Sequence, residues 1–283
     1  MDNPESLMSH PQRYRFISCP QKGLNIPIFG GSMIRGAIGH ALLDQCRCGL
    51  GNHRSDCLYK GLFETAAGNS FVVTPPRPQE LINEEPFTFQ LTLLKPTIER
   101  KRALFDAIER ALNMGLTSER IRCRLLSIES DEPSRERLGK VAFMHLLSPW
   151  FIKRGGKAVS SAQCTAHTLL IGMAQRQRML CEQGLLDIEV PSNIELLRIA
   201  DELTCRLQLH DCRGERRSSR QKSKHPLSGF MGTATLIAPR GGSLAALEPL
   251  LRMAERVHGG GKVSFGLGAL AVQGQTELSS LFV

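Results

Sequence analysis

The alternation of apolar and polar residues predicts a regular succession of strands and helices in the first half of the chain. Extended segments are predicted at residues 14–20, 24–29, 71–74, 87–94 and 120–130. Apolar residues at helical spacing predict two amphipathic helices, at residues 32–46 and 98–114. The first half therefore follows the order strand, helix, strands, helix, strand.

The second half approximates this order, with one strand between its two helices. Its extended segments are predicted at residues 140–147, 228–238 and 263–273, and its helices at residues 165–183 and 244–258. Such a βαββαβ order is that of a ferredoxin-like fold. A charged segment that contains Pro and Gly, residues 130–140, separates the two halves. We therefore predict an α+β protein of two tandem ferredoxin-like domains, residues 1–135 and residues 136–283, the second with a C-terminal glycine-rich loop.

The charge balance narrows the class of partner. The 283 residues include 36 Lys and Arg against 27 Asp and Glu, a formal net charge of +9. Such an excess favours a polyanion, because neutralised phosphates release counterions, and nucleic acid and an acidic membrane surface both fit. The apolar runs are far shorter than the roughly 20 residues of a membrane span, and no signal peptide is visible. Nine scattered cysteines then indicate reduced thiols, so we expect a cytoplasmic protein that does not bind membranes.

The most informative segment is glycine-rich and runs from His258 to Gly268, HGGGKVSFGLG. It follows a predicted helix and precedes a predicted strand, so it is not a P-loop, whose lysine precedes a helix. Glycine amides can approach a ligand closely and cradle phosphate oxygens, and Lys262 adds a positive charge. The candidate phosphate-contacting glycines are Gly259, Gly260, Gly261, Gly266 and Gly268. The alternative is a tight turn before a strand that packs on glycine.

A second segment, Arg213–His225, is strongly basic, RGERRSSRQKSKH. Such a run suits contacts with a nucleic-acid backbone, and arginine also makes bidentate contacts with guanine. Its candidate residues are Arg213, Arg216, Arg217, Arg220, Lys222 and Lys224. Arg154 and Lys157 flank two glycines and form a further candidate phosphate clamp. The alternative for the basic run is a solvated loop.

A helix that reads LLRMAERVH, followed by GGGKVSFGLG and a terminal strand, resembles the C-terminal signature of the RAMP superfamily. Within it, the sequence looks most like the CRISPR repeat-processing endoribonucleases. Three further segments resemble that family in the same order along the chain: SMIRGAIGHALL at residues 32–43, DCLYKGLFETA at residues 56–66 and SSRQKSKHPLSGFMGTAT at residues 218–235.

The resemblance implies two ferredoxin-like domains and a substrate of CRISPR repeat RNA, often folded as a hairpin. It implies cleavage without a metal by the RNA's own 2′-hydroxyl, with a 5′-hydroxyl and a 2′,3′-cyclic phosphate as products. It also implies that the enzyme keeps the hairpin and joins the other subunits of the interference complex. The rival interpretation is a RAMP subunit that binds guide RNA without cutting it.

This chemistry needs a base, an acid and a cation for the phosphorane. His40 is the first candidate, because the family often places its catalytic histidine on the first helix. Arg35, expected at or before the start of that helix, and Lys262 are the candidate cations. The alternates are His258, Tyr14 and Tyr59. A site dominated by arginine, built on Arg35 and the basic run, remains a second hypothesis.

Four potential zinc ligands fall within twelve residues, Cys46, Cys48, His53 and Cys57. Their spacing, C-x-C-x4-H-x3-C, is not that of a standard zinc finger, but the donor types suit a structural zinc. The alternative is a thiol-containing loop without metal. Cysteines and positive charge together also allow a zinc-containing DNA-binding protein, although the glycine-rich tail has no role there. We expect no catalytic metal and no required cofactor.

Overall fold

The structure is a computed structural model that describes residues 10–48, 52–64, 70–132, 137–218 and 223–275. Contacts between residues divide the chain into two compact units. The first unit comprises residues 1–132, 180–187 and 264–266, and the second comprises residues 133–179, 188–263 and 267–283. Each unit has a hydrophobic core of its own.

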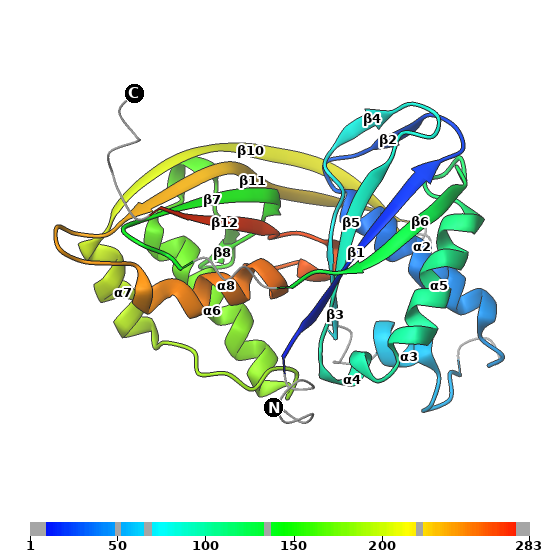
Figure 1. Ribbon diagram of the computed structural model, residues 1–283, viewed down its shortest axis with the longest axis horizontal. Helices are drawn as coiled ribbons and strands as arrows, with labels where there is room; N and C mark the ends of the chain where they lie inside the picture. The colour runs from blue at the N-terminus through cyan, green and yellow to red at the C-terminus, as the bar shows by residue number, and fades with distance from the viewer. Residues whose placement is uncertain (1–9, 49–51, 65–69, 133–136, 219–222, 276–283) are drawn as a thin grey trace. The chain divides into compact units, whose positions relative to one another are not determined.

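The first unit is built on an antiparallel sheet with the strand order β3-β5-β1-β6. These strands are β1 (Gln12–Pro20), β3 (Phe71–Thr74), β5 (Phe87–Leu93) and β6 (Cys123–Ser130). Two helices, α2 (Gly30–Gln45) and α5 (Lys101–Met114), supply the helical positions of a βαββαβ chain order (Figure 1). The smaller elements are β2 (Leu24–Ile26), β4 (Gln79–Leu81), α3 (Leu58–Phe63) and α4 (Lys95–Ile98).

Apolar spacing explains how the first unit closes. Helix α5 buries one stripe of side chains against the sheet, Leu104, Ala107, Ile108, Ala111 and Leu112. The helix ends at Gly115, whose φ of 102° favours glycine. The predicted helix at residues 98–114 is in fact two helices, since α4 ends at Ile98 and α5 begins at Lys101. The predicted strand at residue 120 begins at Cys123, because Leu116 and Ile121 close a turn first.

The second unit repeats the architecture, with the strand order β10-β11-β7-β12. Its strands are β7 (Val141–Trp150), β10 (Thr204–Ser218), β11 (Ser223–Ile237) and β12 (Leu270–Gln275), and its main helices are α6 (Ala166–Glu182) and α8 (Glu248–Val257). A short hairpin, β8 (Lys153–Arg154) and β9 (Lys157–Ala158), follows β7. Counted along the chain, the main strands of both units lie in the order second, third, first, fourth. The predicted fold class, two ferredoxin-like domains, is confirmed.

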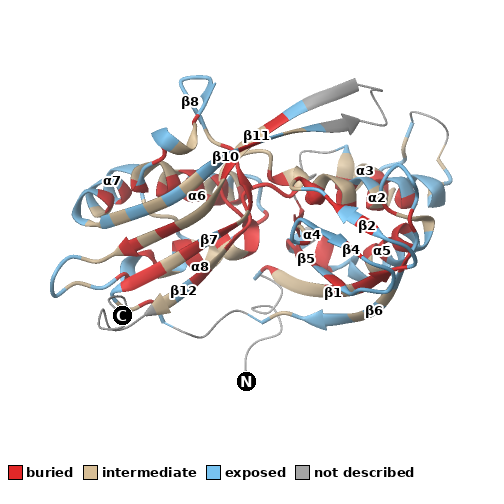
Figure 2. Ribbon diagram, turned by 90° about the horizontal axis from the view of Figure 1, so that it is seen from above, coloured by how far each residue is buried: buried red, intermediate tan, exposed pale blue. Residues whose placement is uncertain are grey.

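Two elements of the second unit were not predicted, helix α7 (Asn193–Glu202) and strand β10. Helix α7 is largely exposed and buries only Leu196 and Ala200 (Figure 2). In β10, by contrast, Cys205, Leu207 and Leu209 alternate with exposed residues and pack against the core, so this strand has a short apolar period that we did not assign. Strand β10 pairs with β11 from Thr204 opposite Ile237 to Ser218 opposite Ser223. The described parts of the basic run, residues 213–218 and 223–225, therefore belong to the paired strands of a long β-hairpin (Figure 1), and residues 219–222 lie outside the described residues.

The C-terminal strand also starts later than predicted. Residues Val263–Phe265 form a short 3-10 turn, and β12 begins only at Leu270. The cause is the glycine-rich segment, in which His258, Lys262 and three glycines adopt positive φ. This backbone cannot pair as a regular strand. Among the described helices, none is long and apolar enough to cross a membrane.

Candidate functional site

Arg35 lies inside helix α2, which corrects the expectation that it precedes the helix and reaches a phosphate. Its guanidinium carbon is 4.5 Å from the ring centroid of Phe63 and 4.3 Å from that of Phe71. Its Nη2 also donates to the carbonyl oxygen of Leu62 at 3.2 Å. Only 8% of the residue is exposed. The geometry therefore assigns Arg35 to the packing of the first unit.

His40 lies on the same helix but is exposed. Residues five apart on a helix are separated by about 140° around its axis, so His40 and Arg35 point to different sides. Its neighbour Gly39 is buried against Phe63, because a Cβ there would lie 3.1 Å from Cε1 of that ring. Histidine is the side-chain type that most often acts as a general acid or base.

The two tyrosine candidates differ in their surroundings. Tyr59 is buried in the core of the first unit and stacks on Phe63 with ring centroids 5.3 Å apart, which excludes a direct contact with RNA. Tyr14 is half-buried, and its hydroxyl donates to Oε1 of Gln12 at 2.7 Å. The same hydroxyl accepts from Nζ of Lys101 at 3.3 Å. Tyr14 therefore keeps a polar, lysine-bonded hydroxyl, whereas Tyr59 is structural.

The backbone amides of the glycine-rich segment are largely used inside the second unit. The amide of Gly259 donates to the carbonyl of Gly268 at 3.0 Å, and that of Gly260 donates to Gly172 at 3.1 Å. The amide of Gly261 donates to Phe151 at 2.7 Å, and that of Gly268 donates to Pro149 at 3.0 Å. The expectation that these four amides cradle a phosphate is therefore wrong, since each is already satisfied.

Close packing explains why these positions are glycine. A Cβ at Gly259 would collide with the ring of Trp150, and one at Gly268 would collide with the carbonyl of Gly259. Gly260 has a φ of 70°, and a Cβ placed there would lie only 2.7 Å from the carbonyl oxygen of Phe151. Gly266 has a φ of 78°. The segment is thus a compact turn that folds onto the end of β7, and its side chains carry the chemistry.

His258 closes the end of helix α8 and does not face solvent. The residue is 0% exposed, and its φ of 64° ends the helix. Its Nδ1 lies 3.0 Å from the carbonyl oxygen of Leu267, which accepts the ring proton. A buried imidazole fixed in this way cannot reach a substrate, so the alternate catalytic role for His258 is wrong.

Lys262 is the cation that the glycine-rich segment presents. Its Nζ lies 4.3 Å from the ring centroid of Phe151 and 3.5 Å from the carbonyl oxygen of Pro226. Nζ of Lys153 lies 5.9 Å from the same ring. Burial, and then the charge of Lys153, hold the pKa of Lys262 below its ordinary value. Two like charges held around one ring favour an anion near them, because it relieves their repulsion.

Lys153 was not among the predicted site residues. In the sequence, Lys153 stands two residues after Phe151 and directly before Arg154, at the start of the β8–β9 hairpin. This pair of basic residues next to an aromatic residue could have indicated it. Arg154 and Lys157 lie on the same hairpin and are exposed. We call Lys153, Arg154, Lys157 and Lys262 the basic patch.

Part of the basic run Arg213–His225 lies on strands β10 and β11 of the second unit. Arg213 is exposed and lies opposite Ser228 in the ladder. The backbones of Arg216 and Arg217 pair with His225 and Lys224, and Arg220 and Lys222 lie outside the described residues. The candidates Arg35, His40, Tyr14 and Tyr59 belong to the first unit, and Lys262, His258 and the basic residues from 153 to 225 belong to the second.

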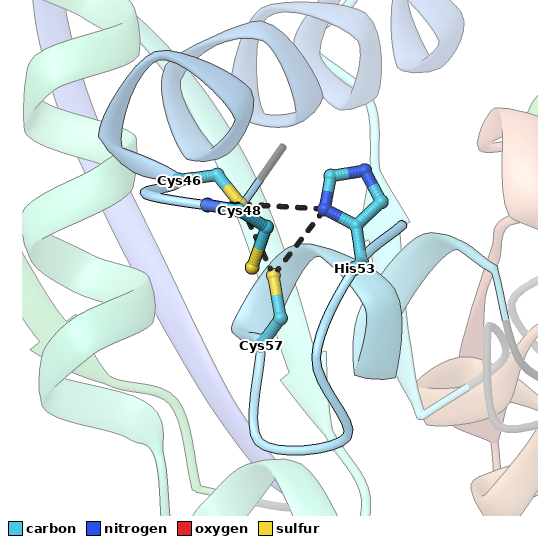
Figure 3. A group of neighbouring side chains, drawn as sticks. All are labelled: Cys46, Cys48, His53 and Cys57. Atoms are coloured by element: carbon cyan, nitrogen blue, oxygen red, sulfur yellow. Dashed lines mark hydrogen bonds between the residues drawn. The ribbon is translucent and has the colours of Figure 1, made fainter. Parts of the chain in front are cut away.

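The structure brings the four predicted zinc ligands together (Figure 3). Sγ of Cys46 lies 3.3 Å from Nδ1 of His53 and 3.4 Å from Sγ of Cys57. Sγ of Cys57 lies 3.7 Å from the same nitrogen. All four donor atoms, including Sγ of Cys48, lie within 4.8 Å of one another. Three sulfurs and one imidazole at this spacing can hold a tetrahedral zinc ion.

Local backbone geometry presents these donors. Cys46 ends helix α2, and its Sγ accepts from the amide of Cys48 at 3.4 Å. The amide of Arg54 donates to Sγ of Cys48 at 3.5 Å, and this hydrogen bond is the main reason that the pKa of Cys48 falls to about 7. A thiol with a lowered pKa is readily deprotonated, which is the form that binds metal.

Family models match both halves of the chain. Residues 144–270 match the family model of CRISPR-associated endoribonuclease Cas6, and residues 10–145 match an N-terminal domain family, AF_1859_N. None of the curated proteins matches the sequence.

Solved structures share the fold over nearly the whole chain. A Cas6 product complex is 18% identical, with a TM-score of 0.61 over 94% of this chain and 100% of its own. Thermus thermophilus Cas6 is 17% identical, with a TM-score of 0.57 over 93% and 98%. A RAMP protein described as binding different RNA substrates is 13% identical, with a TM-score of 0.56 over 93% and 99%. At these identities the solved structures show the fold alone. The family assignment rests on the match of residues 144–270 to the Cas6 model. Over residues 144–270, the chain therefore belongs to the family of CRISPR-associated endoribonuclease Cas6.

Proposed function

We propose that the protein cuts CRISPR repeat RNA without a metal, by attack of the RNA's own 2′-hydroxyl on the adjacent phosphate. The oxygen–phosphorus bond to the 5′-oxygen breaks, leaving a 2′,3′-cyclic phosphate and a 5′-hydroxyl. The observation that carries the proposal is the match of residues 144–270 to the Cas6 endoribonuclease family.

Two side chains take the main chemical roles. The exposed imidazole of His40 moves a proton, either from the 2′-hydroxyl or to the leaving oxygen. Lys262, with Lys153 beside the same ring, stabilises the negative charge that builds on the phosphorane. The hydroxyl of Tyr14, bonded to Lys101, is an alternate proton donor. Arg35 is left out, because it is buried between two rings.

The second unit grips the RNA through charge. Duplex RNA hides its base edges in a deep groove, so a repeat hairpin is recognised mainly by shape and phosphate. The exposed Arg154, Lys157 and Arg213 suit such contacts. The other basic residues of the run Arg213–His225 are further candidate phosphate contacts: Arg216, Arg217, Arg220, Lys222 and Lys224. Retention of the cut hairpin would make the protein a cytoplasmic subunit of the interference complex, bound to its other subunits.

One observation supports the rival function of a guide-RNA-binding subunit that does not cut. Three of the catalytic candidates, Arg35, Tyr59 and His258, are buried and serve packing. A chain that had kept the fold and lost the chemistry would look similar in this respect.

The deciding experiment is incubation of the purified protein with a labelled cognate repeat transcript in the presence of EDTA. A single cut with a cyclic phosphate end supports the proposed enzyme. Slow release of the cut hairpin, followed by native gel shift after the cut, supports retention. Tight binding with no cut under any condition would instead establish the binding subunit.

Cys46, Cys48, His53 and Cys57 bind zinc in a structural role in this proposal, supported by the closeness of the donor atoms. Elemental analysis of protein purified without added chelator should then find one zinc ion per chain. The bond-breaking chemistry is expected to need no metal, and short exposure to EDTA should leave cleavage intact as long as the bound zinc is retained. If EDTA abolished cleavage while the protein still held its zinc, metal-independent cleavage would be contradicted.

A further inference from the structure

The four metal-ligand candidates connect the ends of two helices. Cys46 follows α2, and its amide donates to the carbonyl of Leu43 at 3.1 Å. Cys57 precedes α3, and its carbonyl accepts from the amide of Gly61 at 3.0 Å. A metal ion bound by both cysteines would therefore cross-link the end of α2 to the start of α3.

Helix α3 depends on such support. It has 6 residues, and a helix this short is not stable without tertiary contacts. One contact comes from the metal-ligand loop itself, since Nζ of Lys60 donates to the carbonyl of His53 at 3.0 Å. The position of α3 is therefore coupled to the position of the loop that carries the ligands.

Aromatic rings continue this coupling into the core of the first unit. The imidazole of His53 lies 5.0 Å from the ring of Tyr59. Tyr59 stacks on Phe63 at 5.3 Å with the rings 3° from parallel. Phe63 lies 5.8 Å from Phe71, measured like the other pairs between ring centroids. A row of rings thus leads from a metal ligand, along α3, to strand β3.

Phe63 also touches helix α2 at two points one turn apart. Its ring covers the guanidinium of Arg35 at 4.5 Å, and it leaves only 3.1 Å for a Cβ at Gly39. Arg35 in turn donates to the carbonyl of Leu62 on α3. Because His40 follows Gly39 directly, the ring that α3 carries determines where this turn of α2 lies.

We infer that zinc bound by Cys46, Cys48, His53 and Cys57 is a positioning device for helix α2 and for His40. The ion holds α3, α3 holds Phe63, and Phe63 holds the turn of α2 from Arg35 to Gly39. Zinc then affects RNA cleavage without touching the RNA. The link to cleavage rests on the proposed catalytic function of His40, whereas the link to helix position does not.

The test uses the full chain and begins without RNA. Zinc per chain is measured by elemental analysis, and amide hydrogen exchange is followed in α2, α3 and α6. Cys57→Ser is compared with Cys205→Ser, which changes a half-buried thiol of the second unit. We expect one zinc in the wild type and in Cys205→Ser, and zinc loss in Cys57→Ser with roughly tenfold faster exchange in α2 and α3. Exchange in α6 and the emission of Trp150 should not change, because both report on the second core.

Phe63→Leu distinguishes the contact between Phe63 and helix α2 from the binding of the metal itself. This variant keeps all four ligands and removes the ring that contacts Arg35, so it should keep its zinc while α2 exchanges faster. If the wild type cleaves RNA, the single-turnover cleavage rate of Phe63→Leu should be roughly 10- to 100-fold lower at unchanged RNA affinity, as expected for a misplaced reacting group.

Two results would overturn the inference: wild-type protein without zinc, or Cys57→Ser and Phe63→Leu with α2 exchange equal to that of the wild type. A wild type that binds zinc but never cleaves would refute the proposed function alone, since the exchange measurements still decide whether zinc positions α2.

Discussion

His40 is the single residue on which the proposed proton transfer depends most directly. Replacing it with alanine should lower the single-turnover cleavage rate about 100- to 10,000-fold, the usual contribution of a general acid or base, and leave RNA affinity unchanged. His167→Ala is the matched control, because His167 is a histidine of the second unit whose Nε2 lies 2.8 Å from Asp201. Full activity in the His40 variant would move the chemistry to Tyr14 and the lysines.

Lys262 should leave a signature in the pH profile. Its pKa is lower than that of an ordinary lysine because of burial and the neighbouring Lys153, so it loses its charge at a lower pH. Cleavage that needs this charge should therefore decline on the alkaline side sooner than for a normal lysine. In Lys262→Arg the charge persists, since arginine is effectively always protonated, and the decline should move to higher pH.

Rates measured from pH 7 to 10 with short incubations check this prediction for Lys262. Lys22→Arg serves as control, because Lys22 is exposed in the first unit and belongs to no proposed site. An identical alkaline limb in the wild type and in Lys262→Arg would show that the charge of Lys262 is not needed for the cut.

At the scale of the element, helix α2 contains two glycines in opposite environments. Gly36 is exposed and nothing lies within 4 Å of a Cβ placed there, whereas a Cβ at Gly39 would lie 3.1 Å from the ring of Phe63. Gly36→Ala should stabilise the protein by about 0.5–1 kcal/mol, because alanine loses less backbone entropy in a helix.

Gly39→Ala should instead destabilise the protein by about 1–3 kcal/mol through overpacking against Phe63. Urea unfolding followed by far-UV circular dichroism compares the two variants in one helix with the same chemical change. Equal shifts of the two midpoints would mean that α2 does not pack on α3 as the structure describes.

At the scale of the whole molecule, the net charge of +9 dominates the expected interaction with RNA. The logarithm of the association constant should fall linearly with the logarithm of the salt concentration, because binding releases counterions. Arg213→Gln, at an exposed position of β10, should reduce that slope by about one if it contacts a phosphate. Fluorescence anisotropy with an uncleavable 2′-deoxy substrate measures it, and a slope unchanged from the wild type would remove Arg213 from the interface.

The second unit has a fluorescent reporter of its own. The single tryptophan, Trp150, is 0% exposed and belongs to the core of the second unit. Its emission therefore follows the second unit, and it distinguishes local damage around the zinc ligands from loss of the whole fold.

The amino-acid sequence by itself determined the order of the elements. Alternation in residues 87–94 and helical spacing in residues 98–114 are local patterns, and they follow from which side chains must be buried. The two ferredoxin-like domains, and the presence of four zinc-type donors within twelve residues, were readable for the same reason. Helix α7 was missed because it is largely exposed, and strand β10 was missed because its apolar alternation, Cys205, Leu207 and Leu209, is short.

Only the tertiary structure decided which polar residues are available for chemistry. Arg35 and His258 have the right chemical types, but aromatic rings that lie far from Arg35 in sequence cover its guanidinium, and the turn at Leu267 binds His258. The glycines approach protein backbone and a tryptophan ring instead of a phosphate. Lys153 joins Lys262 through a shared ring that no sequence spacing reveals. Burial and pairing depend on contacts between distant segments, and those contacts exist only in the folded chain.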